Sequence, residues 1–121
     1  MTFLTTEPQL QLNADGVTYT VLSEIWYEHP VYGLFIVPIG FETDLTSNYY
    51  EGPWAKASIL HDYLYYCAPV SRRQADLIYR DAMADLGVSA FRRWRMTTAL
   101  RLFGWRAWRK HRRREACQRS L

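Results

Sequence analysis

The sequence predicts one α+β domain, in which a small N-terminal antiparallel β-sheet or meander is followed by three α-helices packed on it. Residues 1–50 alternate in polarity and are rich in β-branched and aromatic side chains, which is typical of strands. From residue 54 onward, apolar residues recur every three or four positions, which indicates helices. Strands followed by helices favour an α+β fold. With 121 residues, the chain has enough material for one core, so residues 1–121 are expected to form a single domain.

Turn signals separate the predicted strands of the first half. Residues 8–12 (PQLQL) alternate, and residues 13–16 (NADG) are typical of a turn. Residues 17–29 are expected to form one long or bulged strand because they are rich in β-branched and aromatic residues. After a break at residues 30–33 (PVYG), residues 34–38 (LFIVP) resume as a strand.

Two predicted helices, residues 54–67 and 72–86, each carry one apolar stripe. Helical spacing in the first places four residues on one face: Ala57, Leu60, Leu64 and Cys67. Ser71 is the expected N-cap of the second helix, and Gln74 three residues later completes a capping box. Gly87 is placed to end that helix in a left-handed conformation.

A third helix is expected from about residue 90 past Trp108, so that residues 54–108 are helical and residues 109–121 form a frayed tail. Its aromatic residues are interpreted as core, with its arginines facing water or the acidic first half of the chain: Phe91, Trp94, Phe103, Trp105 and Trp108. Residues 91–121 carry a net charge of +10, against −7 for the first ninety. This asymmetry favours an anionic partner, a nucleic acid or a membrane surface, for residues 109–121. The predicted anion-binding residues form one basic run: Arg109, Lys110, Arg112, Arg113 and Arg114.

The cysteine count and hydropathy indicate an intracellular protein. Two cysteines, Cys67 and Cys117, fit no metal-binding spacing. A disulfide between them is one alternative, and reduced thiols are the expectation for a reducing compartment. No run of 18 apolar residues is present, so no transmembrane segment is predicted. The first residues lack the basic start and apolar block of a signal peptide, which favours a cytosol.

The adjacent His61 and Asp62, within the predicted helix 54–67, suggest a polar site. Neighbouring helical residues point about 100° apart, so these two side chains need separate partners. Asp76 lies on the next helix, which a short connection makes an antiparallel neighbour. Asp44 lies in a loop after the last strand, where functional groups gather. A structural interpretation also stays open, in which the imidazole and the carboxylates only satisfy local hydrogen bonds.

These residues define a candidate hydrolase-like site. His61 would act as general base, and Asp76 or Asp44 would orient the imidazole. The supporting residues are Asp62, Tyr65, Thr43 and Ser47. A metal-binding alternative uses His61, Asp44 and either Asp62 or Asp76 as ligands of a divalent metal ion such as zinc or manganese.

The chain resembles a family of small phage and prophage proteins that is classed as a domain of unknown function. The resemblance covers about residues 37–104 and is carried by GFETDLTS, LHDYLYY, SRRQAD and RLFG in that order. Thr46 and the segment NYYEGPW depart from the family pattern. The resemblance implies a phage origin and a polar cluster, but no activity. Its motif positions are Gly40, Thr43, Asp44, Ser47, His61, Asp62, Tyr65 and Asp76.

A more local likeness is to the His-Asp helix of secreted phospholipases. It implies that His61 activates a water, that Asp76 orients His61 and that Asp62 binds calcium. The glycine-rich calcium loop and the many disulfides of those enzymes are absent from the sequence.

Two functional hypotheses result. The first is a phage- or prophage-encoded protein of the host cytoplasm or virion with a hydrolase-like, metal-assisted site. The second is a non-catalytic phage accessory or assembly protein. It would bind a phage or host protein, a nucleic acid or a membrane through its basic, Trp- and Arg-rich C-terminal helix.

Overall fold

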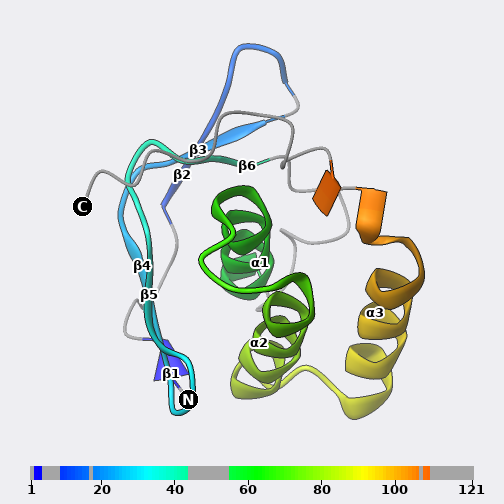
Figure 1. Ribbon diagram of the computed structural model, residues 1–121. Helices are drawn as coiled ribbons and strands as arrows, with labels where there is room; N and C mark the ends of the chain where they lie inside the picture. Colours follow the sequence, from blue (N-terminus) through cyan, green and yellow to red (C-terminus); the bar gives the residue numbers. More distant parts are fainter. Residues whose placement is uncertain (1, 4–8, 17, 44–54, 107, 110–121) are drawn as a thin grey trace.

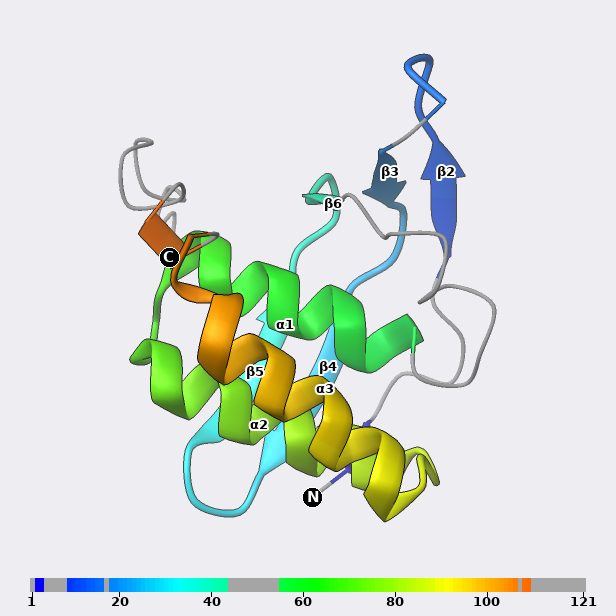
Figure 2. The same ribbon diagram turned by 90° about the vertical axis from the view of Figure 1, so that its right-hand side faces the viewer.

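An α+β arrangement of antiparallel strands followed by three helices confirms the predicted fold class. The computed structural model describes residues 2–3, 9–16, 18–43, 55–106 and 108–109. Figure 1 shows the strands on one side, α1 (Ala55–Cys67) and α2 (Arg72–Asp85) in the middle, and α3 (Ala90–Phe103) on the other side. In Figure 2, α3 lies in front of α1 and α2, and the strands lie behind them. The third helix therefore packs on α2 and forms the outermost layer.

The strands form two three-stranded antiparallel sheets. In the first sheet the order is β1 (Thr2–Phe3), β4 (Ile25–His29) and β5 (Gly33–Val37). In the second sheet the order is β2 (Leu10–Leu12), β3 (Tyr19–Val21) and β6 (Glu42–Thr43). Strand β4 alternates buried and exposed side chains, so one face of its sheet lies against the helices.

The single strand expected over residues 17–29 is wrong, because this segment contributes to both sheets. The chain bends between Val21, the last residue of β3, and Ile25, the first residue of β4. Both side chains are fully buried. The Val21 amide donates to the Phe41 carbonyl at 2.9 Å, and its carbonyl accepts from the Gly40 amide at 2.8 Å. The bend lets the chain change sheets while both apolar side chains stay in one core.

The first two helices follow the sequence prediction closely. The Ser71 side chain accepts from the Gln74 amide at 3.1 Å, and the Gln74 side chain accepts from the Ser71 amide at 3.0 Å. This reciprocal pair confirms the capping box. Gly87 follows α2 with a φ of +83°, the predicted left-handed conformation. The buried stripes of the two helices meet in the core: Ala57, Leu60, Leu64, Ala75, Ile78 and Ala82.

The third helix is interrupted within its predicted range, because α3 ends at Phe103 and a turn at Gly104 follows, and residues 105–106 and 108–109 are helical again. Gly104 is buried, and a Cβ atom there would lie 2.8 Å from the Tyr65 hydroxyl and 2.5 Å from the Leu100 carbonyl oxygen. The glycine therefore permits a close approach to α1. Beyond the turn, the Trp108 ring packs edge-on against the Tyr65 ring at 5.2 Å.

The aromatic side chains of this region are mostly outside the core, which contradicts the interpretation of the C-terminal aromatics as core. Helix α3 contributes no fully buried side chain. Of the five predicted core aromatics, only Trp108 packs against the core, as a partly buried residue. The other four predicted core aromatics are exposed by 42–68%: Phe91, Trp94, Phe103 and Trp105.

Cys67 is the last residue of α1, and its side chain is buried and disulfide-bonded. The expectation of a reduced thiol is therefore wrong for this position. The other cysteine, Cys117, lies outside the described residues. Among the described residues, no helix has the length and apolar character needed to span a membrane.

Candidate functional site

The structure brings His61 of α1 and Asp76 of α2 together. The His61 Nε2 atom lies 2.9 Å from the Asp76 Oδ1 atom, and their side chains are 12% and 16% exposed. The short connection between the two helices makes them antiparallel neighbours, as the sequence predicts. When Nε2 carries the proton, it donates to the carboxylate and leaves Nδ1 as the basic nitrogen.

Two tyrosine rings lie against the His61 ring, and the hydroxyl of one of them contacts the same carboxylate. The Tyr65 hydroxyl donates to Asp76 Oδ1 at 2.7 Å, so this oxygen accepts from two groups. The His61 ring lies 4.3 Å from the Tyr65 ring and 4.5 Å from the Tyr79 ring, measured between centroids. The Tyr79 hydroxyl in turn lies 3.2 Å from the Ser58 hydroxyl. The imidazole is thus held between two tyrosine rings, with its orientation set by Asp76.

Burial raises the pKa of Tyr65 well above its ordinary value. The hydrogen bond to Asp76 and the negative charge of that carboxylate raise the pKa further, and the Arg72 guanidinium opposes them. The pKa of Tyr27 is raised in the same way, first by burial and then by its 2.8 Å hydrogen bond to Asp85. Both phenols therefore stay protonated in the folded protein when they would ionise in the unfolded chain.

The free energy of unfolding is expected to fall as the pH rises above about 10, the pKa of an unperturbed tyrosine. The unfolded chain then binds fewer protons than the folded protein, so the stability that is complete below that pH is progressively lost. Each of the two tyrosines contributes up to about 1.4 kcal/mol per pH unit. Urea unfolding of the native protein and of Tyr65→Phe between pH 9 and about 11 measures this slope. If the free energy of unfolding of Tyr65→Phe fell with pH as steeply as that of the native protein, Tyr65 would not have the raised pKa described above.

Asp62 points away from His61, as the helical geometry predicts. Its Oδ2 atom accepts from the Thr43 hydroxyl at 2.7 Å, which links α1 to β6. Thr43 is 1% exposed, so this hydrogen bond lies at the edge of the core. Asp44 and Ser47 lie outside the described residues. Within the described part of the chain, no three His, Cys, Asp or Glu side chains are grouped to hold a metal ion.

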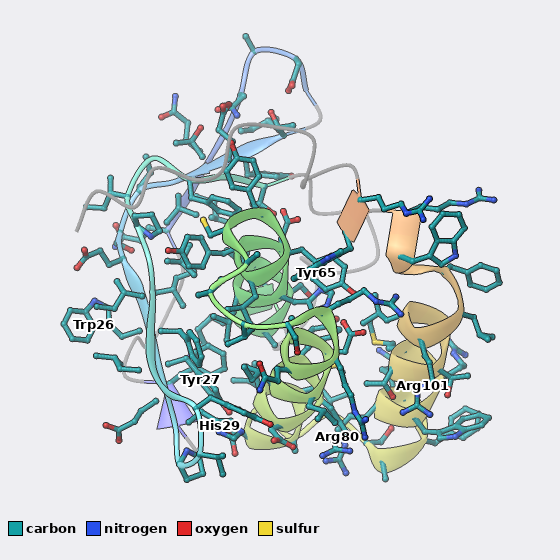
Figure 3. All side chains as sticks on the ribbon, in the orientation of Figure 1. Trp26, Tyr27, His29, Tyr65, Arg80 and Arg101 are labelled. Atoms are coloured by element: carbon teal, nitrogen blue, oxygen red, sulfur yellow. The ribbon has the colours of Figure 1, made fainter. Side chains whose placement is uncertain are left out.

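A second His-Asp pair joins β4 to α2. His29 Nε2 lies 2.9 Å from Asp81 Oδ2, and the His29 Nδ1 atom accepts from the backbone amides of Val31 and Tyr32 at 3.1 and 3.3 Å. Figure 3 shows Tyr27 and His29 on the strand side of α2. Because both ring nitrogens are engaged and His29 is 5% exposed, this pair is structural, which agrees with the structural role predicted for His29.

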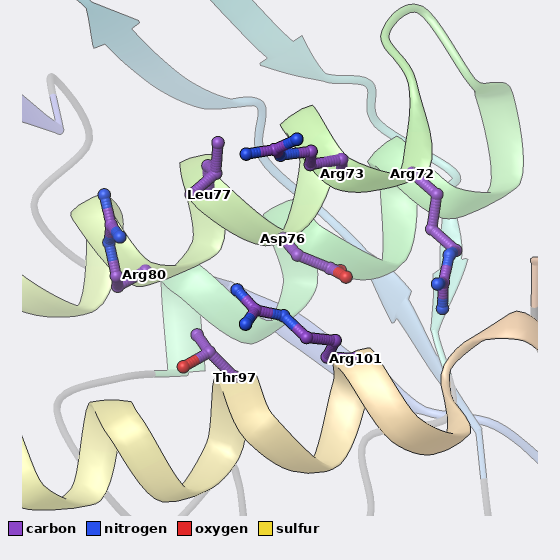
Figure 4. Close-up of a pocket in the computed structure, with 7 residues that line it drawn as sticks. All are labelled: Arg72, Arg73, Asp76, Leu77, Arg80, Thr97 and Arg101. Atoms are coloured by element: carbon purple, nitrogen blue, oxygen red, sulfur yellow. The ribbon is translucent and has the colours of Figure 1, made fainter.

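An arginine-lined pocket between α2 and α3 was not predicted from the sequence. Its volume is about 410 Å³. Figure 4 shows Arg72 and Asp76 directed from α2 toward α3, and Arg101 reaching from α3 into the same space. Arg73 and Arg80 also line this pocket, so its lining contains four arginines and one carboxylate. The signal available in the sequence was the presence of three arginines on a helix within the acidic half of the chain.

The predicted anion-binding run is described only at Arg109. Its guanidinium carbon lies 5.3 Å from the centre of the Trp105 ring, and that of Arg106 lies 5.4 Å from it. These are cation–π distances. The other four residues of the run lie outside the described residues: Lys110, Arg112, Arg113 and Arg114.

Comparisons with curated proteins and with solved structures gave no match. A family model described as "Protein of unknown function (DUF1353)" matches residues 19–100, about two thirds of the chain. The matched region runs from β3 through most of α3 and includes His61, Asp76 and every residue that lines the arginine-lined pocket except Arg101. The chain therefore belongs to the DUF1353 family of proteins of unknown function.

Proposed function

We propose that this protein is a phage- or prophage-encoded accessory protein that binds single-stranded nucleic acid through the outer surface of α3. The observation that carries the proposal is the exposed aromatic pair Phe91 and Trp94. These side chains are 67% and 62% exposed, and their ring centroids lie 6.2 Å apart. Large aromatic surfaces left in water are costly unless a partner covers them.

Arginine side chains accompany the exposed rings. Trp94 lines a pocket that Arg93 and Arg101 also line, so an aromatic face and guanidinium groups lie side by side. Trp105 is flanked by the guanidinium groups of Arg106 and Arg109. Proteins that bind single strands combine aromatic platforms for the bases with cations for the phosphates. A membrane-surface helix instead separates an apolar face from a cationic face, so the interspersion of arginines with the exposed rings favours a nucleic acid.

The phage origin and the location in the host cytoplasm or virion belong to the same proposal. They are supported by the resemblance of GFETDLTS and LHDYLYY to the motifs of a phage and prophage family. A location of the gene among genes for phage structural or replication proteins would agree with this part of the proposal. A gene outside any phage-derived region would contradict it.

Binding is tested by fluorescence anisotropy with a labelled oligothymidylate at several salt concentrations. The native protein is expected to bind at low salt, and each phosphate contact should contribute a slope of about −0.7 to the logarithmic salt dependence. Trp94→Ala should weaken binding by about 5- to 150-fold, because stacking contributes about 1–3 kcal/mol per base.

The matched control is Trp26→Ala. Trp26 is 36% exposed and projects from the strands on the side away from α3 (Figure 3). This variant should bind with native affinity. Equal affinities for Trp94→Ala and Trp26→Ala, or binding to anionic phospholipid vesicles without binding to the oligonucleotide, would contradict the proposal.

A hydrolase-like site is the second candidate function, and the His61–Asp76 pair favours it. An aspartate holds one nitrogen of the imidazole at 2.9 Å, and no hydrogen bond of the other nitrogen occurs among the described residues. Such a pair can act as a general base. The catalytic and metal-binding roles of Asp44 and the supporting role of Ser47 stay predictions. The His61 side chain is only 12% exposed, so a substrate has less access to it than it would have in an open cleft.

Release of nitrophenolate from activated phosphate and carboxylate esters tests this candidate, with and without Zn²⁺ or Mn²⁺. A hydrolase should lose turnover in His61→Gln while keeping its melting temperature within a few degrees. If the native protein shows no turnover above that of buffer with any of these esters, the hydrolase proposal fails.

A further inference from the structure

We propose that a second pocket between α2 and α3 is a binding site for a phosphate group. This phosphate pocket has a volume of about 310 Å³ and is lined by Arg80 of α2 and by Arg93, Trp94, Thr97 and Arg101 of α3, among others. The inference deepens the proposed function. It rests on that function in one respect, because the phosphate is taken to be a phosphodiester of the bound nucleic-acid strand. The pocket itself would recognise the same chemistry in free inorganic phosphate.

Arg93 provides the most specific evidence. Its Nε atom is buried and has no hydrogen-bond partner among the described residues. A buried donor without a partner is destabilising, and it is the only such side-chain atom in the described part of the chain. Arg93 lines the pocket, and a rotation of its side chain that uncovers Nε would let Nε and a terminal nitrogen each donate to one oxygen of a phosphate bound there. This fork-shaped contact is the usual geometry of arginine with phosphate.

The charges of the pocket favour an anion. Arg80, Arg93 and Arg101 line it together, and no carboxylate is among the described residues of its lining. The only ion pair of these three among the described residues joins Arg80 to Asp81 at 3.4 Å, and the Arg80 side chain is 50% exposed. Three arginines that line one pocket give it a positive potential, which a bound anion would reduce. A phosphate group would supply that counter-charge.

A comparison with the neighbouring pocket, which Figure 4 shows, favours the Arg93 side for the phosphate. The two pockets share Arg80, Thr97 and Arg101, so they adjoin. The Asp76 carboxylate lines the first pocket and not the second, and its charge would offset part of the attraction of the arginines for a phosphate there. On the Arg93 side, the exposed Trp94 ring lines the same pocket. A base stacked on that ring would place its own phosphate beside the three arginines.

The test measures binding of two probes to the full chain, inorganic phosphate by calorimetry and an oligothymidylate by anisotropy. Arg93→Gln and Arg80→Gln are each expected to weaken phosphate binding by about tenfold, because each removes a charged hydrogen bond. Arg80 is the safer variant for folding because its side chain is half exposed. Each variant should also reduce the salt slope of oligonucleotide binding by about 0.7.

The matched control is Arg95→Gln, which removes the same charge from α3. Arg95 lines a different pocket, with Met96 and Phe103, and should change both affinities by less than about threefold. Native protein that does not bind phosphate at low salt, or equal losses in Arg95→Gln and in the pocket variants, would overturn the site. If the oligonucleotide still binds in that case, the proposed function stands without the site. Phosphate binding that the pocket variants weaken, without oligonucleotide binding, supports the site and overturns the proposed function.

Discussion

Asp76→Ala is expected to lower the free energy of unfolding by about 3 kcal/mol. The Asp76 Oδ1 atom accepts from both the His61 imidazole and the Tyr65 hydroxyl, at 2.9 and 2.7 Å. Tyr65 is 3% exposed and the His61 side chain is 12% exposed, so water cannot fully replace the lost acceptor. Two donors from α1 would be left without their partner on α2. Urea unfolding at neutral pH measures the change.

Asp76→Asn is the matched variant for this prediction. It keeps an acceptor oxygen of similar geometry but removes the negative charge. Asp76→Asn should therefore lower the free energy of unfolding by roughly half as much as Asp76→Ala. If Asp76→Ala changed the free energy of unfolding by less than about 0.5 kcal/mol, the interaction would not stabilise the packing of α1 on α2. The contact between His61 and Asp76 would then have a role other than stability, and the hydrolase candidate would gain support.

Leu60→Ala is expected to destabilise the protein by about 3 kcal/mol, because it opens a cavity where α1 packs on the rest of the core. Leu60 is 0% exposed and belongs to the single hydrophobic cluster of the described residues. Leu102→Ala makes the same chemical change on α3, where the side chain is 58% exposed. It should alter the free energy of unfolding by less than about 0.5 kcal/mol. Similar losses in both variants would show that the outer surface of α3 is part of the folding core.

Local signals made the first two helices predictable. The buried stripe of α1, with Leu60 and Leu64, follows from spacing within one helix, and the capping box of Ser71 and Gln74 follows from a spacing of three residues. The His61–Asp76 contact was also predictable, because a short connection forces α1 and α2 to lie antiparallel. Each of these features depends on residues close together in the sequence.

The end of α3 depended on contacts that the sequence does not reveal. Apolar residues occur on all sides of this helix, so their spacing could not show which side faces α2. The turn at Gly104 reflects its close approach to Tyr65, a residue of α1. Similarly, the partners of Tyr27 and His29 lie more than fifty positions away, at Asp85 and Asp81. The arginine-lined pockets arise only when α2 and α3 are packed together.

The most direct test of single-strand binding through α3 is a titration of the protein with oligothymidylate, observed through the ¹H–¹⁵N resonances of the tryptophan indoles. The indole of Trp94 is 62% exposed on α3, and that of Trp26 lies on the opposite side of the molecule (Figure 3). The proposal predicts that the Trp94 resonance shifts progressively and saturates while the Trp26 resonance stays in place. A Trp94 resonance that does not move, or that moves no more than that of Trp26, would contradict it.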